Sequence, residues 1–170
     1  HVNDNAIINS IITRSCFDFN SKHLIFFSCT IMYKGSNKPL KEKDFNPNEE
    51  MYPNYFGAGW MKVFVEKLCE FYSRISNTKF TVIRHSNIYG QYDKFDLIKS
   101  HVFGATITKV MKKKKNIVIW GEGSETRDLL HVDDLMNFVS KAILKQKKSF
   151  DIYNVGSSKN ISIKNLAEKI

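Results

Sequence analysis

Apolar positions along the chain alternate between two spacings, one typical of amphipathic helices and one typical of buried strands. Residues 5–16 repeat apolar side chains at helical spacing, whereas residues 23–27 form a short apolar run. The same patterns predict helices over 5–16, 59–75, 100–113, 132–145 and 163–170, and strands over 23–27, 80–83, 116–120 and 150–155. Strands that alternate with helices favour parallel pairing through crossover connections. The sequence therefore predicts an α/β fold with a doubly wound, Rossmann-like parallel sheet.

Residues 34–55 interrupt this alternation and are called the 34–55 excursion below. The excursion contains all three prolines of the chain, Pro39, Pro47 and Pro53, among mixed charges. This composition predicts a surface segment rather than a helix or a strand. Connections of this length are uncommon and usually functional, so we expect the excursion to contribute to a site.

The glycines do not form the turn with which a dinucleotide-binding fold begins. That turn follows a strand, opens a helix and lets the backbone approach a pyrophosphate. Gly57 and Gly59 precede a predicted helix, but they follow a loop and lack a third glycine. We therefore expect the chain to be part of a longer polypeptide, in which the glycine-motif half lies upstream.

Composition narrows the class of protein. The chain has 170 residues, 42% of them hydrophobic, which is enough for one domain with a buried core. It has no apolar run long enough to span a membrane, and its first residues lack the pattern of a secretory signal. Cys16, Cys29 and Cys69 lie in apolar segments, which favours reduced thiols over a disulfide framework. We expect a cytoplasmic protein without a membrane partner.

The net charge of +9 is compatible with several anionic partners and does not select one. Its densest run, residues 112–115, closes a predicted helix, where cations are favoured by the helix dipole. The chain has no zinc-finger spacing, RNA-binding aromatic motif or internal repeat. A nucleic-acid partner would rest on charge alone, so we expect none.

Five segments, in this order, resemble the successive motifs of the extended short-chain dehydrogenases/reductases, the NAD-dependent epimerase/dehydratase family. They are residues 26–33 (FFSCTIMY), 62–70 (KVFVEKLCE), 87–90 (NIYG), 120–123 (WGEG) and 127–134 (RDLLHVDD). Residues 153–156 (YNVG) and the final predicted helix extend the resemblance over nearly the whole chain. Within the family, residues 87–95 running on to His101 are most similar to the GDP-L-fucose synthases.

The resemblance implies an NAD(P)-dependent nucleotide-sugar reductase or epimerase/reductase that acts on a GDP-linked 4-keto-6-deoxy sugar. It implies NADP or NAD as the cofactor, a nucleotide-sugar as the substrate and a homodimer that pairs through the helix from Gly59. Residues 1–90 would then be the C-terminal half of a dinucleotide-binding Rossmann domain. Residues 91–170 would be a small substrate-binding part with interleaved Rossmann elements.

The family's catalytic lysine corresponds to Lys62, but its catalytic tyrosine, four residues earlier, corresponds to Ala58. A phenol beside an ammonium group can deliver a proton to a ketone oxygen, whereas a methyl group cannot. Three explanations stay open: a tyrosine replaced by design, a lineage in which Tyr55 or Tyr52 reaches in from the excursion, or a protein that has lost the reaction.

The family's catalytic hydroxyl residue corresponds to Cys29, with Ser28 and Thr30 beside it. Thr30 is the better proton-bridging type, but its side chain would point to the opposite face of a continuing strand. The resemblance gives His101 the role of acid/base in epimerisation, which suits a group that titrates near neutral pH. The second epimerisation residue, a cysteine in the family, is Ile31, so 4-keto reduction or a single epimerisation is the safer expectation.

The remaining site residues also follow from the resemblance. Lys109, Trp120 and Arg127 match contacts to the nucleotide-sugar, with Arg127 suited to a pyrophosphate and Trp120 to a ring. Asn87 would contact both substrate and cofactor. His131 and Asp133 are interpreted as helping to start the following helix, and we expect no metal site. The expected cofactor contacts are Phe27, Ser28, Lys62, His85, Ser86, Asn87, Ile88 and His101.

Two rival functions stay open. One is a 4-epimerase or 4,6-dehydratase that retains a tightly held NAD. The other is a nucleotide-sugar-binding module without catalysis, which Ala58 and the missing glycine turn would explain.

Overall fold

The computed structural model describes the whole chain except residues 37, 113–116 and 119–120, and it divides into two compact units. Unit 1 comprises His1–His85 and Asn137–Val155, and unit 2 comprises Ser86–Met136 and Gly156–Ile170. The expected division at residue 90 lies close to the break after His85, but the assignment of cofactor and substrate roles to the two parts stays a prediction.

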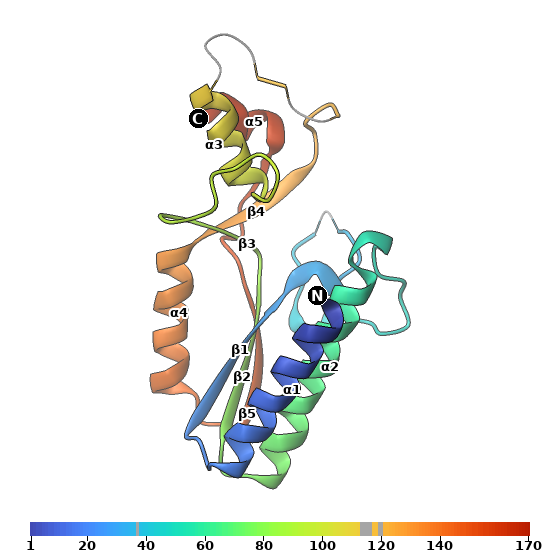
Figure 1. Cartoon of the computed structure of the whole chain (residues 1–170), viewed down its shortest axis with the longest axis vertical. Helices are drawn as coiled ribbons and strands as arrows, with labels where there is room; N and C mark the ends of the chain where they lie inside the picture. The colour runs from blue at the N-terminus through green and yellow to red at the C-terminus, as the bar shows by residue number, and fades with distance from the viewer. Residues whose placement is uncertain (37, 113–116, 119–120) are drawn as a thin grey trace. The chain divides into compact units, whose positions relative to one another are not determined.

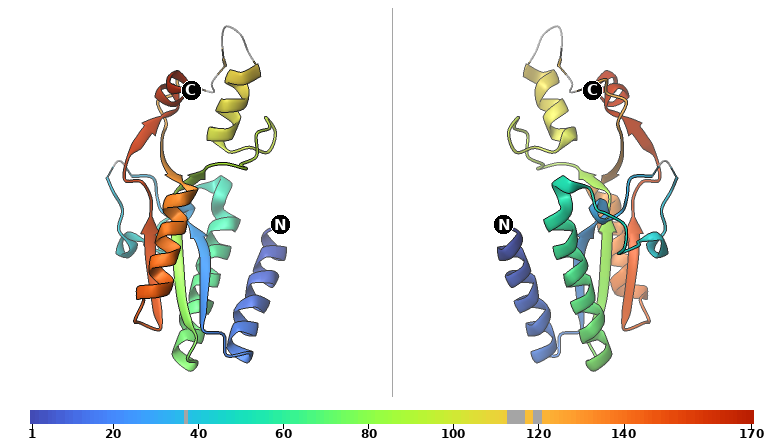
Figure 2. Two further views of the ribbon diagram at one scale, coloured as in Figure 1. Left: turned by 90° about the vertical axis from the view of Figure 1, so that its left-hand side faces the viewer. Right: turned by 90° about the vertical axis from the view of Figure 1, so that its right-hand side faces the viewer.

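Unit 1 is built on a parallel three-stranded sheet with the order β1-β2-β5. Helices α1 and α2 cover one face of this sheet and α4 covers the other, as a doubly wound arrangement requires (Figures 1 and 2). The elements are α1 (Val2–Asp18), β1 (His23–Cys29), α2 (Phe56–Ile75), β2 (Lys79–His85), the part of α4 (Val132–Lys145) from Asn137 onward, and β5 (Phe150–Val155).

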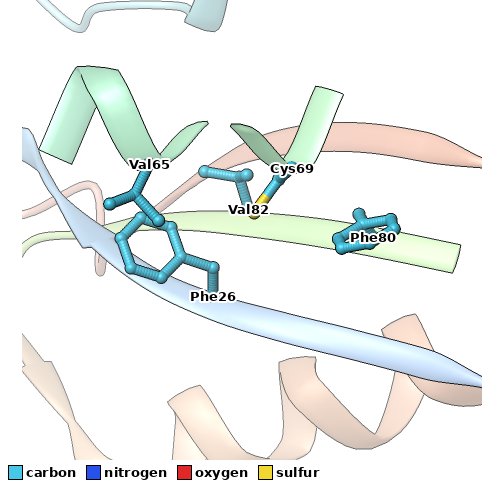
Figure 3. Close-up of a cluster of buried hydrophobic side chains, with 5 residues drawn as sticks. All are labelled: Phe26, Val65, Cys69, Phe80 and Val82. Atoms are coloured by element: carbon cyan, nitrogen blue, oxygen red, sulfur yellow. The ribbon is translucent and has the colours of Figure 1, made fainter. Parts of the chain in front are cut away.

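The core of unit 1 lies between the sheet and α2 (Figure 3). Val65 and Cys69 are four residues apart, so they share the helix face that meets the sheet. Phe80 and Val82 alternate along β2 and are completely buried beneath them, next to Phe26 of β1. The apolar side chains that recur at helical spacing on α2 therefore pack against those of the strands and form one hydrophobic layer.

The 34–55 excursion is not a detached loop. It contains two short 3-10 turns, Glu42–Asp44 and Pro53–Tyr55, and its Met51 is only 2% exposed. Met51 packs with Met32, Tyr33 and Val63 in a second hydrophobic cluster. The expected irregular segment is confirmed, while its anchoring in the core could not be predicted from the sequence.

Unit 2 holds three short strands in the order β3-β4-β6, where β3 and β4 pair in parallel and β4 and β6 pair antiparallel. None of these strands was predicted from the sequence, because each is short and mixes polar with apolar residues. The predicted strand 116–120 falls largely outside the described residues, and residues 117–118 have no regular structure. The elements are β3 (Asn87–Tyr89), α3 (Val102–Lys112), β4 (Thr126–His131), the first residues of α4, β6 (Asn160–Ser162) and α5 (Ile163–Lys169).

Two predicted helix starts had different outcomes. Ser162 caps α5, because its hydroxyl accepts a hydrogen bond of 3.1 Å from the amide of Asn165. Ser100 does not begin α3, which starts at Val102. Instead, its hydroxyl donates to the carbonyl of Lys94 and closes the preceding loop.

No helix in the described part of the chain is long and apolar enough to cross a membrane.

Candidate active site

Lys62 lies on α2 with its ammonium group at the carboxyl end of β1. Its Nζ donates to the carbonyl oxygen of Phe27 at 2.6 Å and lies 4.8 Å from the centre of the Phe26 ring. Burial lowers the pKa of Lys62, while the neighbouring Cys29 and Glu66 act in the opposite direction. A cation held at this place can lower the pKa of a nearby phenol or stabilise a developing negative charge.

The end of β1 carries the candidate hydroxyl residues. Cys29 is the last residue of the strand, and Thr30 begins a 3-10 turn that runs to Met32. The argument from a continuing strand does not apply to Thr30, because β1 ends at Cys29. Burial raises the pKa of the half-buried Cys29 thiol. Ser28 is fully buried and donates its hydroxyl hydrogen to Oε1 of Glu66 at 2.6 Å, so it faces α2.

Ala58, which stands where the family has its catalytic tyrosine, lies in the first turn of α2. Ala58 is half-buried between Gly57 and Gly59, and all three residues lie within the helix. A Cβ atom on Gly59 would lie 2.5 Å from the Met51 sulfur. Gly59 thus allows the excursion to approach the helix closely. This packing role agrees with the interpretation that Gly57-Ala58-Gly59 is not a phosphate-binding turn.

The alternative phenols lie just before that helix. Tyr55 is the last residue of the turn that leads into α2 and stands at its N-cap position. Its ring centre is 5.8 Å from that of Tyr52, and the two residues are 49% and 60% exposed, respectively. Both rings are therefore accessible. A role for Tyr55 in proton delivery stays a prediction.

Glu66 and Arg84 were not singled out as site residues from the sequence, yet they form a buried ion pair beside Lys62. Arg84 Nη2 donates to Glu66 Oε2 at 2.6 Å, and the two side chains are 5% and 3% exposed. Charged side chains are rarely this deeply buried unless they are paired. The apolar run of β2 before Arg84 could have indicated this pair, because an arginine in a buried strand requires a buried anionic partner.

In unit 2, the expected cofactor residues after β2 contact Asp128 of β4. Ser86 donates its hydroxyl hydrogen to Asp128 Oδ1 at 2.9 Å, and the side-chain amide of Asn87 donates to the Asp128 carbonyl at 3.2 Å. Ile88 lies on β3 opposite Leu130. The side chains of Ser86 and Asn87, which were expected to contact the cofactor, thus form hydrogen bonds within unit 2.

The Asp128 carboxylate also binds the chain where it re-enters unit 2 after β5. Its oxygens accept hydrogen bonds from the amide and hydroxyl of Ser157 and from the amide of Ser158, at 2.8–3.0 Å. A Cβ atom on Gly156 would come within 2.7 Å of Oδ2, so only glycine permits this approach. Asp128 therefore joins separate segments of unit 2, which residue spacing does not reveal although Asp128 lies in the RDLLHVDD segment.

The substrate-side candidates flank α3 and β4. His101 is exposed and immediately precedes α3, whereas Lys109 lies on that helix and donates from Nζ to the carbonyl of Val118 at 2.8 Å. Arg127 is exposed on β4, and its Nη1 donates to the carbonyl of Thr126 at 2.8 Å. Trp120 lies outside the described residues.

His131 and Asp133 act at the start of α4, as interpreted. The amide of Asp133 donates to His131 Nδ1 at 3.3 Å, which satisfies one of the amides that a helix start leaves unpaired. In the described part of the chain, no group of His, Cys, Asp or Glu side chains is arranged to hold a metal ion.

A model of the NAD dependent epimerase/dehydratase family matches residues 1–156. The chain belongs to this family. The fold and the order of the motifs agree with the match. The resemblance inferred from the sequence is confirmed at the level of the family.

Several relatives within the epimerase/dehydratase family are GDP-L-fucose synthases. Putative GDP-L-fucose synthase 2 of Arabidopsis thaliana is 30% identical over an alignment of 176 positions, gaps included, that covers 98% of this chain and 52% of that protein. GDP-L-colitose synthase of Yersinia pseudotuberculosis is 30% identical over an alignment of 152 positions, gaps included, that covers 86% of this chain and 49% of that protein. The chain therefore spans about half the length of the curated relatives it matches.

Solved structures of other proteins share the fold of this chain. The GDP-L-fucose synthetase of Naegleria fowleri bound to NADP superposes with a TM-score of 0.86 at 22% identity, covering 97% of this chain and 52% of that one. A GDP-mannoheptose C4 reductase of Campylobacter jejuni with NADP bound gives 0.82 at 24% identity, covering 98% of this chain and 61% of that one. The predicted Rossmann-like α/β fold is thus confirmed.

Proposed function

We propose that this chain is the part of an NAD(P)-dependent GDP-sugar reductase or epimerase/reductase that carries the catalytic lysine and the substrate-side residues. The observation that carries the proposal is the Lys62 ammonium, half-buried and held 2.6 Å from the Phe27 carbonyl at the carboxyl end of a parallel strand. Ligands of open α/β sheets bind outside the carboxyl ends of the strands. The named functions of the relatives, GDP-L-fucose and GDP-L-colitose synthesis, support a GDP-linked deoxy sugar.

The residues at this edge fit the nicotinamide end of a dinucleotide but not its pyrophosphate. Lys62 and the end of β1 offer a cation, a thiol and a hydroxyl, whereas Gly57 and Gly59 lie within α2 and Gly59 packs against Met51. A bound reduced nicotinamide would supply the hydride. The part played by this chain would be to hold a cation beside the reacting oxygen and to bind the nucleotide-sugar through Lys109, Trp120 and Arg127, with His101 as the acid/base of a single epimerisation.

The decisive experiment restores the missing phenol. Ala58→Tyr in the complete natural polypeptide should raise the turnover of 4-keto reduction by about 10²–10⁴-fold, which is the usual contribution of general acid catalysis. Affinity for the nucleotide-sugar should stay nearly unchanged, because the phenol acts on the transition state. The loss of NADPH absorbance with a GDP-4-keto-6-deoxy sugar measures the first quantity, and calorimetry measures the second.

Tyr55→Phe is the matched control, because it removes a single hydroxyl from the neighbouring turn. If Tyr55 delivers the proton, this variant abolishes turnover and Ala58→Tyr changes little. If neither variant alters the rate of an active protein, the placement of the reaction beside Lys62 is wrong.

A binding module without catalysis is the second candidate, and it is favoured by Ala58 itself, which leaves the Lys62 helix without its phenol. In that case the unmodified polypeptide binds a GDP-sugar but consumes no NADPH. The Ala58→Tyr variant consumes none either. Arg127→Ala should weaken such binding by about 1.5–3 kcal/mol, as the loss of a hydrogen bond to a charged group does. Unchanged calorimetric affinity would remove Arg127 from the substrate site.

We further propose that the protein forms a homodimer through α1 and α2 and works in the cytoplasm. The two helices expose large apolar side chains in stripes at helical spacing, which on a monomer would face water. They are Ile7, Ile8, Ile11 and Ile12 on α1, and Phe56, Phe64, Phe71 and Ile75 on α2. Sedimentation velocity should show a dimer that Phe64→Glu with Phe71→Glu dissociates; a wild-type monomer at micromolar concentration would refute it.

A further inference from the structure

Three residues at the same level of the unit 1 sheet form a row across its carboxyl edge. Ser28 of β1 is paired in register with Arg84 of β2, and Arg84 is paired in register with Asn154 of β5. Residues that are level in neighbouring parallel strands direct their side chains to the same face. The row is therefore placed to be linked by side chains that reach over that face.

Glu66 links the first two members of the row. Its Oε1 accepts the Ser28 hydroxyl hydrogen at 2.6 Å and Arg84 Nε at 3.1 Å, and its Oε2 accepts Arg84 Nη2 at 2.6 Å. Glu66 is one helical turn beyond Lys62 on α2. Since Lys62 holds the Phe27 carbonyl, two successive turns of α2 bind two successive residues of β1.

Tyr33 links the second pair. Arg84 Nη1 donates to the Tyr33 hydroxyl oxygen at 2.7 Å, and that hydroxyl donates to Asn154 Oδ1 at 2.8 Å. The guanidinium carbon also lies over the rings of Tyr33 and Phe45, 5.4 and 5.2 Å from their centres. The face of the Arg84 guanidinium is thus held by two aromatic rings, and its nitrogens are held by hydrogen bonds.

The same residues tether the 34–55 excursion. Arg84 Nη1 donates to the Glu42 carbonyl at 3.2 Å, and the backbone amide of Asn154 donates to Glu42 Oε1 at 2.7 Å. The side-chain amide of Asn154 donates to the Leu40 carbonyl at 3.0 Å. One connected set of hydrogen bonds therefore runs from the end of β1, through Glu66 and Arg84, to the excursion.

Stability alone does not account for a buried ion pair. Burying two charges forfeits their hydration, and well-packed apolar residues of similar volume are often as stabilising or more so. What apolar residues cannot do is hold a hydroxyl, a carbonyl and a phenol in defined directions.

We propose that Glu66 and Arg84 are a positioning pair for the proposed reaction: they hold the end of β1 against the Lys62 ammonium and hold the 34–55 excursion beside it. This inference rests on the proposed function for its purpose, but its physical content does not need substrate turnover. Among the described residues, the titratable groups that act on Lys62 are Cys29 from β1 and Glu66 from its own helix.

The test uses Glu66→Gln, which keeps the shape of the side chain and removes its charge. NMR of 15N-labelled lysine, with Lys62→Arg to assign the signal, should show a lower pKa for Lys62, because a neighbouring charge that favours the ammonium form is gone. Amide hydrogen exchange at residues 28–32 and 40–45 should speed up by about tenfold, since an uncharged amide holds the Ser28 hydroxyl and the Arg84 guanidinium less firmly than a carboxylate does. An unshifted Lys62 pKa with unchanged exchange in a folded variant would overturn the proposal.

The matched control replaces both charges with apolar side chains of similar volume, Glu66→Leu with Arg84→Met. If the pair positions, this variant recovers the melting temperature that Glu66→Gln loses, but residues 40–45 stay fast in hydrogen exchange. If it also recovers protection at 40–45, the pair only supports the fold and the proposal fails.

Two milder variants keep the test open if Glu66→Gln does not fold. Tyr33→Phe removes the link to Asn154 and should speed exchange at 40–45 but not at 28–32. Ser28→Ala removes the link to β1 and should speed exchange at 28–32 but not at 40–45. Equal effects of the two variants on both segments would contradict a network with two separate arms. Because no readout uses substrate, failure of the proposed reaction would leave these outcomes unaffected.

Discussion

Two carboxylates organise the strand ends of this protein, and they do so by different physical means. Glu66 in unit 1 is buried and paired with the guanidinium of Arg84, whereas Asp128 in unit 2 is half-buried and accepts hydrogen bonds from hydroxyls and backbone amides. Each holds residues that the family resemblance places in the site. Glu66 reaches Ser28, next to Cys29, and Asp128 reaches Ser86.

The difference predicts how each unit responds when its carboxylate or the partner is changed. A buried charge that loses its counter-charge cannot be hydrated, so the free energy of unfolding falls by a large amount. A half-buried carboxylate that binds neutral donors keeps access to solvent, and its donors can find water in its place. Unit 1 should therefore be the more sensitive of the two.

The largest effect is expected for Arg84→Met, which leaves the Glu66 carboxylate buried and unpaired. Such changes lower the free energy of unfolding by about 3–5 kcal/mol. Urea unfolding followed by circular dichroism measures it, with Glu66→Leu plus Arg84→Met as the compensated control. A loss below about 1 kcal/mol in the single variant would mean that the pair is hydrated in solution.

A smaller loss is expected for Asp128→Asn, because the amide turns a donor group toward other donors. The free energy of unfolding should fall by about 1–3 kcal/mol, because the side chain then offers one acceptor oxygen to donors that the carboxylate serves with two. Ser157→Ala, which removes one of the bonds to Asp128, should cost less than half as much in the same urea experiment. The prediction is wrong if the two variants are equivalent.

Alkaline pH separates the units further, through a thiol one turn beyond Glu66. Burial raises the pKa of Cys69 to about 12 from 9.0, so between these values the unfolded chain loses a proton that the folded chain keeps. Stability from this group is complete below pH 9.0 and falls by about 1.4 kcal/mol per pH unit above it. Comparing wild type with Cys69→Ala from pH 8 to 10 cancels the lysine titrations, and parallel curves would refute the effect.

The smallest change concerns a helix start in unit 2. Ser162→Ala should lower the free energy of unfolding by about 1 kcal/mol, because the amide of Asn165 loses its cap. Ser162→Asp should keep most of the stability, since a carboxylate can accept the same hydrogen bond. Equal stability of the two variants would show that α5 does not need this cap.

The fold could be predicted where local periodicity and burial agree. The predicted bounds of α4 and β5 match those observed, and α1, α2 and β2 differ from their predictions only at their ends. Prediction failed for β3, β4 and β6, which contain polar residues such as Asn87, Arg127 and Asn160. Short strands of this kind are stabilised by their neighbours, so the local pattern carries little information about them.

The site divides in the same way. The position of Lys62 on a helix and the role of His131 at the start of α4 follow from residue spacing and family motifs. The inward direction of Ser28, the end of β1 before Thr30 and the roles of Glu66 and Asp128 do not follow from spacing. The assignments of catalytic and substrate roles to these residues stay predictions.

The amino-acid sequence alone settled the class of fold, the family and the segments that carry its motifs, because these depend on periodicity and on the order of residues along the chain. The tertiary structure alone decided which polar side chains are buried together. Ser28, Glu66 and Arg84 are separated by 18 to 56 residues, and Glu66 meets Arg84 only because α2 packs over the edge where β1 and β2 end. A charge is tolerated in a core only when folding brings its partner to it, and no local pattern records that partner.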